Sequence, residues 1–204
     1  MPVDFHAFTS KKSTWHKYLL KDDDLSIILS EIFMGNDFVE ISRKDLFDLA
    51  KAGNYKKFII STILWGYPAG MRGNHFQNIA DDIVALSSLL KQATEGISDW
   101  SAHYSEVKKI RGLGLSTYTK FLYFIEAKVN SFPCVIFDKR IIDTINKKSI
   151  DGFYSLKQVK SYNSDAKYPE YLKCIDVAAK KYEAKHGQVE MFVFQFGLNI
   201  KTHK

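Results

Sequence analysis

Residues Val107 to Arg140 read VKKIRGLGLSTYTKFLYFIEAKVNSFPCVIFDKR, and the prediction of the fold starts from them. This stretch begins with a basic segment, turns at a Gly-x-Gly pair, and continues as an apolar run from Ser116 to about Lys128. A short loop with one proline then leads to Asp138, which stands directly before another segment of helical pattern. This order predicts a helical hairpin followed by a carboxylate at the start of the next helix.

The turn between the two predicted helices has the composition of a phosphate-binding site. Gly112 and Gly114 carry no Cβ, so the backbone can turn tightly and approach a partner closely. Ser116 is a favourable N-cap residue and opens the second helix together with Thr117; the free N–H groups of such a first turn attract anions. The cations around this turn are Lys108, Lys109, Arg111 and Lys120. The alternative is a plain helical hairpin whose glycines only end a helix, because Gly-x-Gly is a short motif.

Two fragments of this stretch, IRGLGLSTYTKFL and VIFDKRI, resemble the helix-hairpin-helix DNA glycosylase superfamily. The hairpin is Ile110 to Gly114, the loop is Asn130 to Phe137, and the superfamily's aspartate falls on Asp138. The segments WGYPAGMRGN (65–74) and VEMFVFQFG (189–197) further resemble bacterial proteins with an 8-oxoguanine-glycosylase fold. The resemblance implies an all-α, two-lobed fold with the active-site cleft between the lobes.

By this resemblance Asp138 is the catalytic residue. Cutting an N-glycosidic bond builds positive charge on the sugar, and a fixed carboxylate stabilises that charge and can orient or deprotonate water. An isolated aspartate before a helix is more often a plain N-cap. The hairpin upstream favours the catalytic interpretation.

Ser116 stands where the 8-oxoguanine glycosylases have a nucleophilic lysine. A serine hydroxyl cannot form a Schiff base with the sugar, so the sequence predicts a monofunctional enzyme that uses water. Lys120, one helical turn further on, is the candidate amine for a bifunctional enzyme; its plainer interpretation is a solvated or phosphate-facing lysine. Arg111 stands where many relatives have proline, so the start of the turn is expected to differ.

The composition favours a globular protein with an anionic partner. The chain has 204 residues, and 46% of them are hydrophobic, which suffices for a buried core. The 29 Lys and Arg residues exceed the 23 Asp and Glu residues, a net charge of +6 that favours nucleic acid, although many basic proteins bind none. No apolar stretch approaches ~20 residues, so no membrane span is expected. We expect double-stranded DNA as the partner, a monomer, and a cytoplasmic, nucleoid-associated location.

The number and spacing of the cysteines give no indication of a cofactor site. Cys134 and Cys174 give neither a metal-ligand spacing nor a disulfide framework, so neither the iron–sulfur cluster of some relatives nor any required cofactor is expected. By the resemblance, the backbone carbonyls of Lys108, Ile110 and Leu113 can hold a K⁺ or Na⁺ ion that braces the hairpin.

Helical patterns extend over almost the whole chain, and strand signals are weak. Asn54 caps an apolar helix that is expected to be central, and Asn74 begins a helix that is predicted to run to about Ala93 with Gln77 at its capping-box position. Pro169 is predicted to open another helix as its first residue.

The domain prediction is a single glycosylase domain over residues 1–204. It has an inner lobe, approximately 40–137, that includes the hairpin. The second lobe comprises 1–39 and 138–204.

The loop from Trp65 to Gly73 is the second candidate feature. A glycosylase must extrude its target base and stack it on apolar groups, and the loop residues Trp65, Tyr67 and Arg72 suit base stacking or gap filling. A packed interhelix loop with Trp65 in the core is an equally good interpretation. The neighbouring His75 is interpreted as a surface or cap residue.

The apolar stripe near the C-terminus, Met191, Phe192, Phe194 and Phe196, is interpreted as core. Glu190 or Gln195 is the residue of this segment that can face the cleft.

Together these observations predict a DNA N-glycosylase that flips out and excises a damaged or modified base by hydrolysis. Its biological setting is base-excision repair or defence against modified phage DNA. The alternatives are a bifunctional 8-oxoguanine glycosylase/AP lyase that uses Lys120, a non-catalytic helix-hairpin-helix DNA-binding module, and a purely structural helical protein. Asp138 separates the enzyme from the binding module, because a module that only binds phosphates has no use for a carboxylate beside them.

Overall fold

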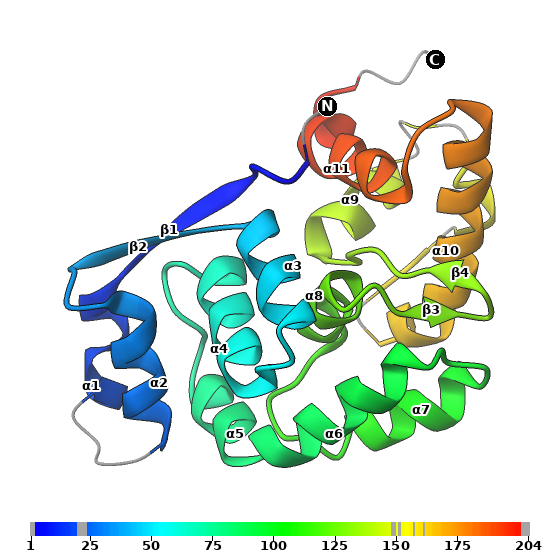
Figure 1. Cartoon of the computed structure of the whole chain (residues 1–204). Coiled ribbons are helices and arrows are strands. Elements are labelled where there is room, and N and C mark those ends of the chain that lie inside the picture. The colour runs from blue at the N-terminus through cyan, green and yellow to red at the C-terminus, as the bar shows by residue number, and fades with distance from the viewer. Residues whose placement is uncertain are drawn as a thin grey trace. The chain divides into compact units, whose positions relative to one another are not determined.

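Helices form most of the chain in the computed structural model (Figure 1). The structure describes residues 3–19, 24–147, 150, 152–156, 158–160 and 162–200. Over these residues the sheet structure consists of two short antiparallel strand pairs. The prediction of an all-α fold is confirmed.

The chain divides into two units by its internal contacts. The N-terminal unit runs up to Lys91 and includes Val107–Leu113, and the C-terminal unit comprises Gln92–Glu106 and the chain from Gly114 onward. These boundaries differ from those of the lobes predicted from the sequence, and the division into those lobes stays a prediction.

The N-terminal unit consists of short helices and one strand pair. Its elements are β1 (Ala7–Lys11), η1 (Lys12–Trp15), α1 (His16–Leu19), α2 (Asp24–Phe33), β2 (Phe38–Ser42), α3 (Arg43–Lys51), α4 (Tyr55–Gly66), α5 (His75–Asp81) and most of α6 (Ile83–Thr94). β1 and β2 pair with Ala7 opposite Ser42 and Lys11 opposite Phe38. This pairing was not predicted, because its two strands are far apart in the sequence and each is short.

α4 is the core helix of the N-terminal unit. Every residue from Phe58 to Trp65 is buried. The helix begins where the sequence predicts, because the Asn54 side-chain oxygen accepts the N–H of Lys57 at 3.2 Å. The expected central position of this apolar helix is confirmed.

The predicted helix from Asn74 to Ala93 is two helices, α5 and α6. They are separated at Asp82, whose φ of −97° and ψ of 16° are not helical. Gln77 does not complete a capping box; its amide donates to Asp81 Oδ1 at 2.6 Å. Consecutive aspartates are weak helix formers because their side chains compete for backbone groups, which accounts for the break.

The C-terminal unit contains the remaining elements, apart from Val107 at the end of α7. They are α7 (Trp100–Val107), α8 (Leu115–Phe124), β3 (Lys128–Val129), β4 (Phe132–Pro133), α9 (Lys139–Lys147), η2 (Tyr154–Leu156), α10 (Ser164–Lys181), α11 (His186–Phe196) and η3 (Gly197–Asn199). Within the described ranges, no helix is both long and apolar enough to cross a membrane.

α10 begins at Ser164, so the prediction that Pro169 is its first residue is wrong. A proline inside a helix cannot donate to the carbonyl four residues earlier, which here belongs to Asp165. The indole N–H of Trp100 donates to that carbonyl at 2.7 Å. This contact satisfies the carbonyl that the proline leaves without its usual partner.

α10 also holds the extended segment that leads to Asp138. The hydroxyl of Tyr168 donates to the Val135 carbonyl at 2.9 Å, and that of Tyr171 donates to the Ile136 carbonyl at 3.1 Å. The Tyr171 ring stacks on Phe137 with ring centroids 4.3 Å apart. The backbone before Asp138 is therefore fixed by buried contacts.

Candidate active site

The hairpin turn is defined by backbone hydrogen bonds. The Ile110 N–H donates to the Val107 carbonyl at 3.0 Å, and the Leu113 N–H donates to the Ile110 carbonyl at 3.3 Å. The Gly-x-Gly pair follows at once. The sequence therefore predicts the position of the turn correctly.

α8 begins one residue earlier than predicted. Gly114 is its N-cap, and the Gly114 carbonyl accepts the N–H groups of Thr117 and Tyr118, each at 3.0 Å. The prediction that Ser116 caps the helix is wrong, because Ser116 is its second residue. The first-turn N–H groups of Leu115 and Ser116 are the ones left for an anion.

The two glycines of the turn have different environments. Gly112 has φ +80°, and a Cβ there would lie 2.8 Å from His75 Cα and 2.9 Å from the His75 carbonyl oxygen. Gly114 has φ −90°, and no described atom lies within 4 Å of an added Cβ. Gly112 is thus required by packing inside the protein, whereas Gly114 leaves open space in front of the backbone.

The basic residues of the hairpin are divided between surface and interior. Lys108, Lys109 and Arg111 are exposed. Thr117 is buried, so its side chain does not reach a phosphate at the surface. Lys120 is also buried, with 6% of its surface exposed.

Lys120 reaches back along α8 to Ser116. Its Nζ donates to the Ser116 carbonyl at 2.9 Å and to the Ser116 hydroxyl at 3.0 Å. The amine therefore lies beside Ser116, the position at which the 8-oxoguanine glycosylases that this chain resembles carry their nucleophilic lysine. From the sequence, Lys120 is described either as a solvated side chain or as one that faces a phosphate. Its burial fits neither description.

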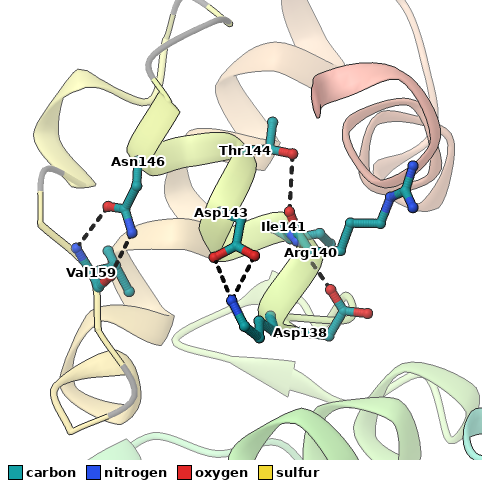
Figure 2. Close-up of polar contacts among 8 residues, drawn as sticks. Asp138, Arg140, Ile141, Asp143, Thr144, Asn146 and Val159 are labelled. Atoms are coloured by element: carbon teal, nitrogen blue, oxygen red, sulfur yellow. Dashed lines mark hydrogen bonds and ion pairs between the residues drawn. The ribbon is translucent and has the colours of Figure 1, made fainter. Parts of the chain in front are cut away.

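Asp138 is half-buried and caps α9 (Figure 2). Its Oδ1 accepts the Ile141 N–H at 3.0 Å. The preceding N–H, that of Phe137, donates to the Thr119 hydroxyl of α8 at 3.1 Å. No hydrogen bond to Oδ2 occurs among the described residues. One carboxylate oxygen is thus fixed by the helix, and no described residue engages the other.

α9 is held near both of its ends, as Figure 2 shows. The Arg140 guanidinium donates to the Phe194 and Gln195 carbonyls of α11 and lies over the Phe194 ring, 5.2 Å from its centroid. The Asn146 amide donates to the Val159 carbonyl at 2.7 Å and accepts the Val159 N–H at 3.1 Å. These contacts fix the helix that Asp138 caps.

The apolar stripe on α11 is only partly core. Met191 is buried, but Phe192 and Phe196 are 44% and 45% exposed, and their ring centroids lie 5.6 Å apart. Glu190, which the sequence had offered for the cleft, is fully buried. The four-residue spacing of Phe192 and Phe196 was the signal for a shared exposed face, and it was missed because the whole segment is apolar.

Trp65 lies in the core of the N-terminal unit. It is 3% exposed, and its ring contacts those of His6 and Phe8 and the guanidinium of Arg43. Burial, followed by the charge of Arg43, lowers the pKa of His6. This packing favours the interpretation of Trp65 as a core residue over that of a base-stacking residue.

The other two residues of the Trp65–Gly73 loop differ in exposure. Tyr67 is half-buried, and Arg72 is exposed.

The predicted site residues are divided between the two units. Those of the C-terminal unit are Gly114, Ser116, Thr117, Lys120 and Asp138. Those of the N-terminal unit are Trp65, Tyr67, Arg72, Lys108, Arg111 and Gly112.

The surroundings of the two cysteines disfavour the thiolate form of each. Burial raises the pKa of the Cys134 thiol to about 12 and also raises that of Cys174. Over the described residues, no group of three or more His, Cys, Asp or Glu side chains is placed to hold a metal ion. The Ile110 carbonyl, one of the three predicted to hold a monovalent cation, accepts the Leu113 N–H at 3.3 Å. The cation site stays a prediction.

A comparison with protein families gives one match to this chain. The model of the family described as "Putative 8-oxoguanine DNA glycosylase OGG-like protein" matches residues 1–194. No curated protein and no solved structure matches the chain.

Proposed function

The chain belongs to this family of OGG-like proteins, and we propose that it excises a damaged or modified base by hydrolysis at Asp138. Membership of a DNA glycosylase family implies DNA binding. The proposed partner is double-stranded DNA, bound by a monomer in the cytoplasm or nucleoid.

The position of Asp138 is the observation that carries the proposal. Departure of the base leaves an electron-deficient sugar, and a carboxylate that is already fixed stabilises that charge without reorganising. The Ile141 N–H holds Oδ1, and the Phe137–Thr119 hydrogen bond ties the residue before Asp138 to α8. Oδ2 can then face the sugar cation and orient the attacking water.

The hairpin supplies the DNA contacts of the proposal. Gly114 leaves open space in front of the first turn of α8, and the exposed side chains of Lys108 and Arg111 lie in the preceding turn. Backbone N–H groups and cations of this kind bind phosphates and position DNA without reading its sequence. By the resemblance, the backbone carbonyls of Lys108, Ile110 and Leu113 remain the proposed site of a monovalent cation that would brace the turn.

Phe192 and Phe196 are the proposed stacking surface for the extruded base. Both rings are partly exposed, and they lie on α11, whose last turn is bound by Arg140 of α9. Aromatic faces accept a flipped base by stacking. Arg72 and Tyr67 are retained as the gap-filling candidates.

A second candidate, a bifunctional glycosylase/lyase, is favoured by the position of Lys120. Its amine lies 3.0 Å from the Ser116 hydroxyl and is largely shielded from water. After losing its proton, such an amine can attack the sugar carbon, displace the base and form a Schiff base that permits strand cleavage.

An excision screen separates the two mechanisms. Duplexes that carry different oxidised, alkylated and hypermodified bases are incubated with the wild-type protein and with Asp138→Asn, then split into samples with and without hot alkali. Hydrolysis yields strand breaks only after alkali, whereas a lyase yields them without it. Release of phage-type modified bases alone would assign the protein to defence, and release of oxidised bases would assign it to repair. Failure of the wild-type protein to release any base would contradict the enzyme proposal and leave the DNA-binding module.

A further inference from the structure

His75 lies against the hairpin turn at the surface of the N-terminal unit. A Cβ added at Gly112 would lie 2.8 Å from His75 Cα and 3.0 Å from the imidazole Nδ1. His75 is exposed, and so is Arg111, the neighbour of Gly112. The imidazole therefore stands beside Gly112, two residues before Gly114, whose open side the proposed function assigns to a DNA phosphate.

Arg72 belongs to the same surface. It is exposed, and its carbonyl accepts the His75 N–H at 3.4 Å, so the two residues share one turn. In the described part of the chain, the side chains of Arg72, His75 and Arg111 make no hydrogen bond or ion pair. Among the described residues, these three side chains are thus exposed donors for an anion, and the His75 imidazole is the one that lies against Gly112.

We propose that His75 is a DNA-backbone contact that takes up a proton when DNA binds. Its imidazolium would donate to the phosphate at the hairpin, with Arg111 and Arg72 as further cations. This assigns Arg72 to the DNA backbone in place of gap filling. The proposal rests on the proposed DNA glycosylase function and adds a residue and a proton to its DNA contacts. Histidine is suited to this because it gains its charge near neutral pH.

The charges near His75 bear on how DNA binding is coupled to its protonation. The charged residues of the hairpin, the preceding loop and α5 are Arg72, Asp81, Lys108, Lys109 and Arg111. Asp81, the acid among them, is hydrogen-bonded to Gln77. η1 and α1 pack on the neighbouring Phe76 through the uncharged rings of Trp15 and Tyr18. A phosphate beside an imidazole attracts a positive charge onto it. Binding of DNA at this surface should therefore be coupled to uptake of a proton by His75.

The test is duplex binding as a function of pH, measured by fluorescence anisotropy on an unmodified duplex. The variant is His75→Gln, which keeps a hydrogen-bonding side chain but cannot become charged. The matched control is His16→Gln, another exposed histidine of the same unit. Thermal unfolding of both variants checks the fold, and excision of a substrate base at about pH 8, where histidine is mostly neutral, checks the proposed function separately.

Wild type and His16→Gln should gain roughly three- to tenfold in affinity from about pH 8 to about pH 6, the size of one exposed charge-assisted contact. His75→Gln should show no such gain. At about pH 6 the negative slope of log affinity against log salt should be less steep by about 0.9 in His75→Gln than in the wild type, as expected for the loss of one phosphate contact. Arg72→Gln should reduce that slope at both pH values and leave the pH response intact.

A His75→Gln protein that excises its base and keeps the wild-type pH response would overturn the role of His75 and leave the glycosylase function standing. Loss of the pH response in His16→Gln instead would also overturn it. A wild-type protein that binds no duplex would contradict the proposed function and this inference together.

Discussion

Replacing Gly112 and Gly114 one at a time should separate folding from DNA binding. Alanine at Gly112 must hold φ +80°, which costs an L-residue about 1–2 kcal/mol. Its Cβ would also overlap the His75 backbone, at 2.8 Å from Cα and 2.9 Å from the carbonyl oxygen. Relieving an overlap of this kind costs about 1–3 kcal/mol, so Gly112→Ala should lose roughly 2–5 kcal/mol of unfolding free energy.

Gly114→Ala should leave stability nearly unchanged. Its φ of −90° and ψ of 163° suit any residue, and no described atom lies within 4 Å of the added Cβ. Alanine is a poorer N-cap than glycine by about 0.5 kcal/mol, and the stiffer unfolded chain returns about 0.4–1 kcal/mol. The added Cβ does, however, enter the space through which a phosphate reaches the first turn of α8. Duplex affinity should fall by about tenfold, the value of one good hydrogen bond.

The assay combines urea unfolding with duplex binding on the same protein preparations. Gly35→Ala is the matched control for strain, because Gly35 has φ +81° and no described atom within 4 Å of an added Cβ. The excess loss of stability in Gly112→Ala over Gly35→Ala measures the clash with His75 alone. Equal losses in the two variants would refute that contact. Wild-type duplex affinity in Gly114→Ala would refute the approach of a phosphate to the hairpin.

The remaining predictions concern chemistry, salt and acid. Asp138→Asn should slow single-turnover excision on the order of 100-fold to 1000-fold, retain duplex affinity and cost ~1 kcal/mol or less of stability, as measured by excision, binding and unfolding. Borohydride should trap no adduct with the wild type; an adduct that is lost in Lys120→Ala would replace hydrolysis by the lyase mechanism. Log affinity for duplex should fall against log salt with a slope of about −3 to −5 if roughly three to five phosphates are bound, and a salt-independent affinity would contradict the hairpin contacts. Hydrogen bonds from Lys180 and His186 lower the pKa of Asp176, so its contribution to stability is present above about pH 4, the range of an unfolded aspartate, and is lost as pH falls through the lowered folded pKa. Asp176→Asn should therefore flatten the fall of unfolding free energy in a urea series below about pH 4.

The parts of the fold that the sequence predicts well are those with local causes. The glycine turn, the helix after it and the helix after Asp138 follow from short-range patterns of breakers, caps and apolar spacing. Asn54 is a further example, because its side chain caps α4 as expected. Caps, breakers and apolar spacing involve residues within about one helical turn of each other. They can therefore be recognised in the sequence without knowledge of tertiary contacts.

The errors come from contacts between distant parts of the chain. The first turns of α10 were not predicted from the sequence, because a proline is typical of the first residue of a helix. Pro169 can lie inside the helix because the Trp100 indole N–H donates to the Asp165 carbonyl, a contact that the sequence does not show. The packing role of Gly112 depends on His75, which lies far away in sequence. The sequence attributes the freedom of both hairpin glycines to DNA, and only the folded chain separates the one that packs from the one that is open.

The sequence leaves a choice at Asp138 between a helix cap and a catalyst, and the geometry makes these roles compatible. Capping engages Oδ1 through the Ile141 N–H, whereas catalysis requires a second, correctly aimed oxygen. The cap removes rotational freedom from the side chain before substrate arrives, which is the preorganisation that electrostatic stabilisation of a sugar cation needs. Asparagine preserves the cap through its own side-chain oxygen but removes the charge, while alanine removes both. If the cap serves catalysis by aiming the carboxylate, Asp138→Glu, which keeps the charge and shifts its position, should be nearly as slow as Asp138→Asn in single-turnover excision. A glutamate variant with wild-type excision would mean that the charge alone matters, and that the hydrogen bond to Ile141 serves only the helix.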